Sequence, residues 1–282
     1  MKRGFILMKD LVIYTVLVAV LGMMLFYGEK SYREASLYEE LTVELVSHQG
    51  AEEQAKSQLG KFAKSILGGF YHDERAATLD AIREKQEAAM MKAKEYTIYF
   101  MILLVILLLG YFFTSLRAFT LFGSLAALLT LVLGLITPIL MVTIHKEVEY
   151  IGDIVLSFES KGVVGSIQKL FESGDIVVAL VIFLFSVLIP VLKVLSLLIV
   201  SLFLQSNFAH GIIKFFKMIG KWSMVDVFVV AVFLVYLTSN KGEISRAEVE
   251  VGLYFFLAYV IVSMLVSLSA DKMLHKSKDE VR

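Results

Sequence analysis

The chain has 282 residues, of which 58% are hydrophobic and only 19% are charged, and its formal net charge is +0. A soluble domain of this length is far more polar, and several apolar runs reach the about 20 residues that a helix needs to cross a bilayer. We therefore expect an all-α polytopic membrane protein, and the balanced charge gives no reason to expect nucleic acid as a partner. The sequence contains no cysteine, which excludes disulfides, cysteine-ligated iron–sulfur clusters and thiolate zinc ribbons.

Residues 1–27 are predicted to form a short basic tail and the first membrane span. Three basic residues precede an apolar run that ends at Tyr27. No small-x-small cleavage pattern follows this run, so we expect the span to be retained rather than removed as a signal peptide.

Residues 28–95 are polar, rich in Glu, Lys, Ala and Gln, and contain no proline. Apolar residues recur at helical spacing, as in Leu37 and Leu41, and glycines at Gly50 and Gly68–Gly69 are natural breaks. The pattern predicts two or three amphipathic helices that stand outside the membrane. A solvated helical spacer without a binding site is the alternative.

Five further spans are predicted downstream, which makes six in all. They cover about 96–116 (within a segment 96–118), 121–144, 176–204, 223–238 and 251–270, and a charged tail follows at 274–282. The loop at 145–175 carries apolar residues that hint at short strands.

Lysine and arginine are distributed unevenly among the loops of this six-span arrangement. The N-terminal tail, the turn at Arg117, the loop at 205–221 and the C-terminal tail are basic, and all four fall on one side. The other loops lean acidic. By the positive-inside rule both termini are cytoplasmic, and the segments 28–95 and 145–175 lie on the far side of the membrane.

Two charged residues lie within predicted spans, at Lys193 and Asp226. Ionisable groups inside a membrane are candidates for functional sites. Lys193 is some ten residues from the end of its span at Leu204, which makes snorkelling to the interface difficult. We expect the two residues to pair, because an unpaired buried charge is the costlier arrangement. A lipid phosphate is the alternative counter-charge for Lys193.

The only two prolines, Pro138 and Pro190, both lie inside predicted spans. A proline inside a helix frees a carbonyl and bends the helix, so two bends in neighbouring spans can open a cavity. Tolerated kinks without a cavity are the alternative. Gly123, Ala127 and Gly134 line one stripe of the third predicted span, and such small residues let helices pack closely in lipid.

Signatures of catalysis and of metal binding are missing. The sequence has no Gly-rich phosphate loop and no Gly-x-Ser-x-Gly turn, and its five histidines are scattered. We therefore predict no catalytic residues, no metal and no cofactor.

Three stretches in the second half of the chain stand in a fixed order: LITPIL at 135–140, SVLIPVLK at 186–193 and GKWSMVDVF at 220–228. In motif, order and spacing, residues 119–273 resemble one transmembrane module of the paraquat-inducible protein A family. The motif and helix-shaping residues that carry this resemblance are Thr137, Pro138, Ser186, Pro190, Trp222, Ser223 and Met224, beside the charged residues Lys193 and Asp226.

Members of that family are bacterial inner-membrane proteins that act beside periplasm-spanning proteins with MCE domains in moving lipids between membranes. The resemblance implies that the last four spans form a tetraspanin-like module with a small extracytoplasmic strand region. Typical members have two modules, each preceded by a cysteine-rich zinc ribbon. This chain has one module and no cysteine, and it adds two spans and the segment 28–95 in front.

The expected protein is thus a non-enzymatic component of the bacterial inner membrane in an MCE-type lipid transport system. It would pass phospholipid to a periplasmic MCE-domain protein. The alternative is a membrane sensor or scaffold that uses 28–95 to dock a partner. A proton- or redox-linked membrane enzyme is disfavoured, because the chain lacks cysteine and clustered histidine.

Overall fold

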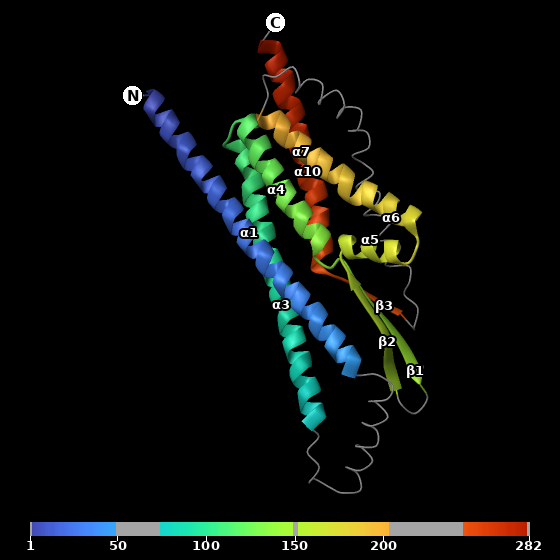
Figure 1. The fold of residues 1–282 in the computed structure, drawn as a ribbon. Helices are drawn as coiled ribbons and strands as arrows, with labels where there is room; N and C mark the ends of the chain where they lie inside the picture. The colour runs from blue at the N-terminus through green and yellow to red at the C-terminus, as the bar shows by residue number, and fades with distance from the viewer. Residues whose placement is uncertain (1, 49–73, 149–151, 203–244, 281–282) are drawn as a thin grey trace, which may run out of the picture.

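The computed structural model describes residues 2–48, 74–148, 152–202 and 245–280. Helices dominate these ranges, and a three-stranded sheet stands at one end of the helical bundle (Figure 1). The helices are α1 (Lys2–His48), α3 (Glu74–Leu109), α4 (Leu116–Ile136), α5 (Val163–Glu172), α6 (Ile176–Ile182), α7 (Ile189–Leu202) and α10 (Val251–Glu280). The 3₁₀ turn Gly110–Phe112 follows α3, and the π-helical segment Phe183–Leu188 joins α6 to α7.

Five helical segments among the described residues are long and apolar enough to cross a membrane. They are Leu11–Leu45, Thr78–Phe112, Leu116–Ile136, Ile176–Leu202 and Val251–Met273. A multi-pass membrane protein follows from these lengths. The predicted fifth span, 223–238, lies outside the described residues, so the count of six remains a prediction.

The turn between the second and third spans lies earlier than the sequence predicts. Helix α3 ends at Leu109 and α4 already begins at Leu116. Ser115 caps α4, because its Oγ accepts a hydrogen bond from the Ala118 N–H at 3.2 Å. Arg117 therefore lies in the first turn of a helix and not in a loop.

The third span is shorter than predicted. Helix α4 ends at Ile136, and its C-cap residue Thr137 is extended at φ −75° and ψ 143°. A residue that precedes proline is pushed out of the helical region by the proline ring, and this ends the helix. Pro138 thus terminates the span, and the prediction that it bends a helix from within is wrong.

The chain that follows Pro138 forms the sheet. Strands β1 (Leu140–Val148), β2 (Gly152–Lys161) and β3 (Ser245–Val249) pair antiparallel in the order β2-β1-β3. The predicted strand region 145–175 therefore begins too late, since β1 already starts at Leu140. It also ends too late, because residues 163–172 form the helix α5. β-branched residues in β1 favour the extended state after the helix has ended.

Helix α4 lies at the centre of the bundle. Ala126, Ala127 and Leu131 on α4 have no exposed surface, and they share one core with α1, α3, α7 and α10. Opposite them, Phe100 of α3 and Phe255 of α10 meet edge to face with ring centroids 5.0 Å apart. Large apolar side chains on the outer faces remain exposed, as lipid-facing surfaces require.

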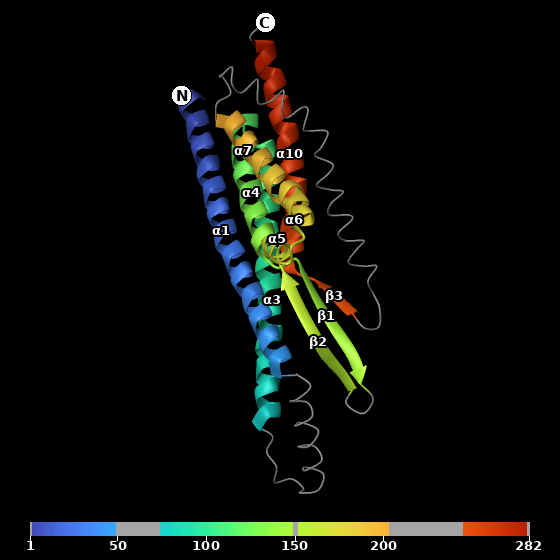
Figure 2. The ribbon, with the colours of Figure 1, turned by 45° about the vertical axis from the view of Figure 1, so that its right-hand side comes forward.

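Helices α1 and α3 run antiparallel and continue beyond the bundle as a hairpin (Figures 1 and 2). Residues 28–48 and 74–95 are helical, as their periodicity predicts. Leu41, Leu45 and Ile82 form a small buried cluster between the two helices. The predicted breaks at Gly50 and Gly68–Gly69 lie outside the described residues.

Candidate functional site: buried polar groups in the helical bundle

Pro190 shapes the helix that carries the candidate site. Proline has no N–H, and its ring clashes with the carbonyl of the residue four positions earlier, here Ser186. The chain accommodates this with the π-helical segment Phe183–Leu188, after which the Ile189 N–H bonds to the Leu184 carbonyl. Ser186 is buried within this wider turn. Such π segments recur at functional sites in membrane and soluble helices.

Lys193 lies one turn after Pro190 and is buried, with 7% of its surface exposed. Its Nζ donates a hydrogen bond of 3.2 Å to Ser263 Oγ on α10, and Ser263 itself has no exposed surface. Ser263 donates in turn to the Val260 carbonyl at 3.0 Å. The structure thus joins α7 to α10 through these two buried side chains.

Further polar contacts join α4 to α7 and to α10. Arg117 of α4 donates from Nε to the Ser201 carbonyl and from a terminal guanidinium nitrogen to the Leu202 carbonyl, each at 3.0 Å. A cation at helix carbonyls is favourable because the C-terminal end of a helix carries partial negative charge. Thr120 Oγ1 also lies 3.2 Å from Ser269 Oγ of α10. These contacts fix α4, α7 and α10 relative to one another around Lys193.

The junction at Thr137 and Pro138 joins the bundle to the sheet. The Pro138 carbonyl accepts from the Gly252 N–H at 2.9 Å, and the Ile139 carbonyl accepts from the Glu250 N–H at 3.0 Å. A Cβ on Gly252 would come within 2.4 Å of the Thr137 carbonyl oxygen, so only glycine fits there. Thr137 is fully buried, and its Oγ1 has no hydrogen-bond partner among the described residues.

Glu250 is a buried carboxylate that the sequence assigns to an exposed acidic loop. Only 1% of its surface is exposed, and it lies between the end of β3 and the first residue of α10. An acid at a helix N-terminus interacts favourably with the helix dipole. An acidic residue directly before an apolar run is the signal that points to this position.

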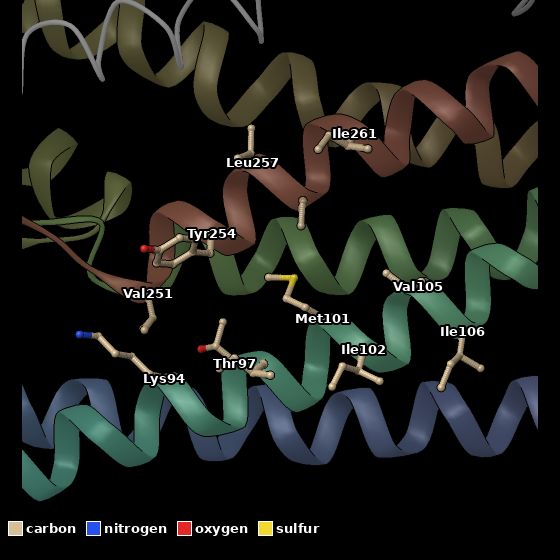
Figure 3. A pocket seen from close by; sticks show the side chains of 12 residues that line it. Lys94, Thr97, Met101, Ile102, Val105, Ile106, Val251, Tyr254, Leu257 and Ile261 are labelled. Carbon is tan, nitrogen blue, oxygen red and sulfur yellow. The ribbon is translucent and has the colours of Figure 1, made fainter.

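The structure places a cavity away from the two prolines. It has a volume of about 700 Å³ and lies between α3 and α10 (Figure 3). The expected bend at Pro138 is absent because its helix has already ended at Ile136, whereas Pro190 does lie inside a helix, α7.

The third motif stretch is not part of the described chain. Trp222, Ser223, Met224 and Asp226 lie outside it, so the pairing of Lys193 with Asp226 stays a prediction. Within the described ranges, no group of three or more His, Asp or Glu side chains could hold a metal ion.

Comparisons with known proteins place this bundle in a family context. The family model described as paraquat-inducible protein A matches residues 117–275, which include α4, the sheet, α7 and α10. A probable intermembrane transport protein of Haemophilus influenzae is 28% identical over 117 residues, and these cover 39% of this chain. Intermembrane transport protein PqiA of Escherichia coli K12 is 28% identical over 115 residues and likewise covers 39% of this chain.

The matched segments cover only 28% and 27% of these two relatives' own lengths. No solved structure matches the chain. The helices α1 and α3 lie before the residues that the family model matches.

Proposed function

Because this chain belongs to the paraquat-inducible protein A family, we propose that it is an inner-membrane component of an MCE-type lipid transport system. In this proposal it moves phospholipid between the membrane and a periplasmic partner with MCE domains. The names of its relatives describe intermembrane transport, which supports a membrane transport role and no enzymatic one.

The observation that carries the proposal is the buried ammonium group of Lys193 inside the family module. A charge in a low-dielectric interior needs a counter-charge or strong hydrogen bonds. Ser263 supplies a neutral acceptor at 3.2 Å. We propose that Asp226 balances the charge at rest and that a lipid phosphate exchanges with it during transport.

The orientation of the chain in the membrane is also part of the proposal. The start of α1 and the end of α10 lie at the same end of the bundle, and the sheet and the α1–α3 hairpin lie toward the other (Figures 1 and 2). Basic residues flank the termini. We therefore place both termini in the cytoplasm, and the sheet and hairpin in the periplasm, where a partner can reach them.

The proposal is tested by isolating the intact, tagged chain from native membranes after chemical crosslinking. We expect an MCE-domain protein to be recovered with it, and we expect deletion of the chain to change the phospholipid distribution between the inner and outer membranes. The unsubstituted chain returned to the deletion strain is the control and should restore the phospholipid distribution, whereas the Lys193→Ala variant should not. Recovery of no MCE-domain protein together with an unchanged lipid distribution would refute the proposal.

A sensor or scaffold is the second candidate, and the α1–α3 hairpin favours it. Tyr38 and Ala89 of the hairpin form a buried cluster with Met141 of the sheet, which holds the hairpin and the sheet together at the end where a partner would dock. In a scaffold the hairpin would be essential while Lys193 would not. Substitution of Lys193 without any effect on lipid distribution would therefore favour this candidate.

A further inference from the structure

An elongated apolar groove runs along the outer surface between α3 and α10. One side is formed by Ile98, Ile102 and Ile106 of α3, and the other by Leu257 and Ile261 of α10 (Figure 3). Ile98 and Ile102 are more than half exposed, at 58% and 52%. The groove lies within two segments that are apolar enough to span a membrane, so lipid rather than water is its surroundings.

The groove is polar at one end only. Lys94, Thr97 and Tyr254 line this end, and Figure 3 shows the Lys94 ammonium group and the Tyr254 hydroxyl on either side of Val251, both directed outward from the apolar lining. Lys94 has no ion pair within the part of the chain that the structure describes. A cation and a phenol at the same end of an apolar groove, one from each wall, complement a phosphate attached to a hydrocarbon chain.

The length of the groove matches one leaflet of a bilayer. The lining residues of α3 run from Lys94 to Ile106, and twelve helical steps of about 1.5 Å span roughly 18 Å. Half of a hydrocarbon layer about 30 Å thick is about 15 Å. A ligand with its charge at Lys94 would therefore reach the middle of the bilayer at Ile106.

We propose that this groove binds a single membrane phospholipid, with its phosphate at Lys94 and Tyr254 and an acyl chain along Ile98, Ile102 and Ile106. Polar groups gather at one end, the lining is apolar elsewhere, and the length fits one leaflet. This inference rests on the proposed function, because the groove would hold the phospholipid that is transported. One of its walls, α3, precedes the residues that the family model matches, and the other, α10, lies within them, so the site forms where the added N-terminal part meets the family module.

The test is photocrosslinking of the full chain in lipid nanodiscs of phosphatidylethanolamine and phosphatidylglycerol. A benzophenone amino acid replaces Ile102 in one variant and Val18 in the matched control. Val18 is an apolar residue of α1 that is 58% exposed and does not line the groove. We expect several-fold more phospholipid adduct at Ile102 than at Val18, measured by mass spectrometry of the intact protein.

The role of the charge is tested in the same experiment with Lys94→Gln and Lys94→Arg. Lys94→Gln should lower the Ile102 adduct about fivefold, which corresponds to the contribution of one lysine at an anionic membrane surface. Lys94→Arg should preserve it, and the Val18 adduct should not change. Lys94 is exposed, so an unchanged melting temperature of the variants is expected and shows that they fold.

Three results would overturn the inference: equal adducts at Ile102 and Val18, an Ile102 adduct that does not depend on Lys94, or an Ile102 crosslink to protein instead of lipid. Failure of the proposed function is distinguishable. If no MCE-domain partner and no lipid redistribution are found while the adduct still depends on Lys94, the transport role fails and the groove stands. If Lys94→Gln abolishes the adduct and leaves lipid redistribution intact, the groove is not on the transport route.

Discussion

Lys193 shows how one charged side chain can define a site in an apolar bundle. Its ammonium group is almost fully removed from the surface and reaches across from α7 to α10. Removing one member of a buried ion pair strands the other charge in a poor solvent, which typically costs about 3–5 kcal/mol. The hydrogen bond to Ser263 alone is expected to contribute about 1.5–3 kcal/mol, the range for bonds to charged groups.

We predict that Lys193→Ala and Asp226→Ala each lower the stability of the protein by a few kcal/mol or abolish transport. The double substitution should be milder than the sum of the two, because neither charge is then left without its partner. The measurement is thermal unfolding in detergent together with the lipid distribution between membranes. Lys92→Ala, at an exposed lysine of α3, is the control that should change neither. Strictly additive losses would exclude the pair.

The sequence reveals some of these residues and hides others for identifiable reasons. Lys193 is visible because a lysine stands out in a long apolar run. Ser263 is not, because a serine in a span is common and usually bonds to its own helix, as Ser263 also does with the Val260 carbonyl. The burial of Glu250 is not visible in the sequence, because it depends on β3 pairing with β1 and on the hydrogen bonds from Glu250 and Gly252 to the Ile139 and Pro138 carbonyls.

At the scale of whole elements, the close packing of α4 against α10 organises the bundle. The small residues of α4 face α10, and a Cβ on Gly134 would lie 2.8 Å from the backbone nitrogen of Phe256. Backbone atoms cannot move aside as a flexible side chain can. A substitution there forces the two helices apart and so disturbs Ser263, which lies two turns further along α10.

We predict that Gly134→Ala destabilises the protein by about 1–3 kcal/mol, the usual range for overpacking. Gly22→Ala in α1 is the matched control, since a Cβ there meets nothing within 4 Å. Alanine is favoured over glycine inside a helix by about 1 kcal/mol, so Gly22→Ala should be neutral or stabilising. Thermal unfolding of both variants in the same detergent measures the difference. Equal effects of the two substitutions would contradict the close packing of α4 and α10.

The sequence predicts the elements better than their ends. Long apolar runs predict five spans after the first, and the structure has apolar helices at all four of those that it describes, because length and hydropathy are local properties. The end of α4 at Ile136 is missed because the apolar run continues into β1, so hydropathy alone cannot separate helix from buried strand. The restriction that Pro138 places on Thr137 is the local signal that marks this boundary.

At the scale of the whole molecule, the arrangement has two chemically different ends. Both described chain ends lie at one end, and the polar half of the α1–α3 hairpin projects from the other with the sheet beside it (Figures 1 and 2). The two-ended layout agrees with the distribution of basic residues in the sequence. Which end faces the cytoplasm is decided by the charges that flank the spans during insertion.

We predict that Glu84→Cys reacts with an impermeant maleimide in intact spheroplasts and that Ser277→Cys reacts only after the membrane is permeabilised. Glu84 is exposed on the projecting part of α3, and Ser277 lies near the end of α10. The natural sequence has no cysteine, so labelling reports on the introduced thiol alone. Labelling of Ser277→Cys and not of Glu84→Cys in intact spheroplasts would reverse the orientation.

The length of α1 has a mechanical consequence. Its 47 residues form one helix without proline, about 70 Å long at about 1.5 Å per residue, which is more than twice the about 30 Å of bilayer hydrocarbon. An uninterrupted helix of this kind tilts as one rigid rod about the place where it packs against α3 and α4. A small tilt of its membrane part swings its outer end through a larger arc. A partner bound to the outer hairpin would thus change the tilt of α1 in the membrane. Because α1 packs against α3, this change would also move one wall of the α3–α10 groove.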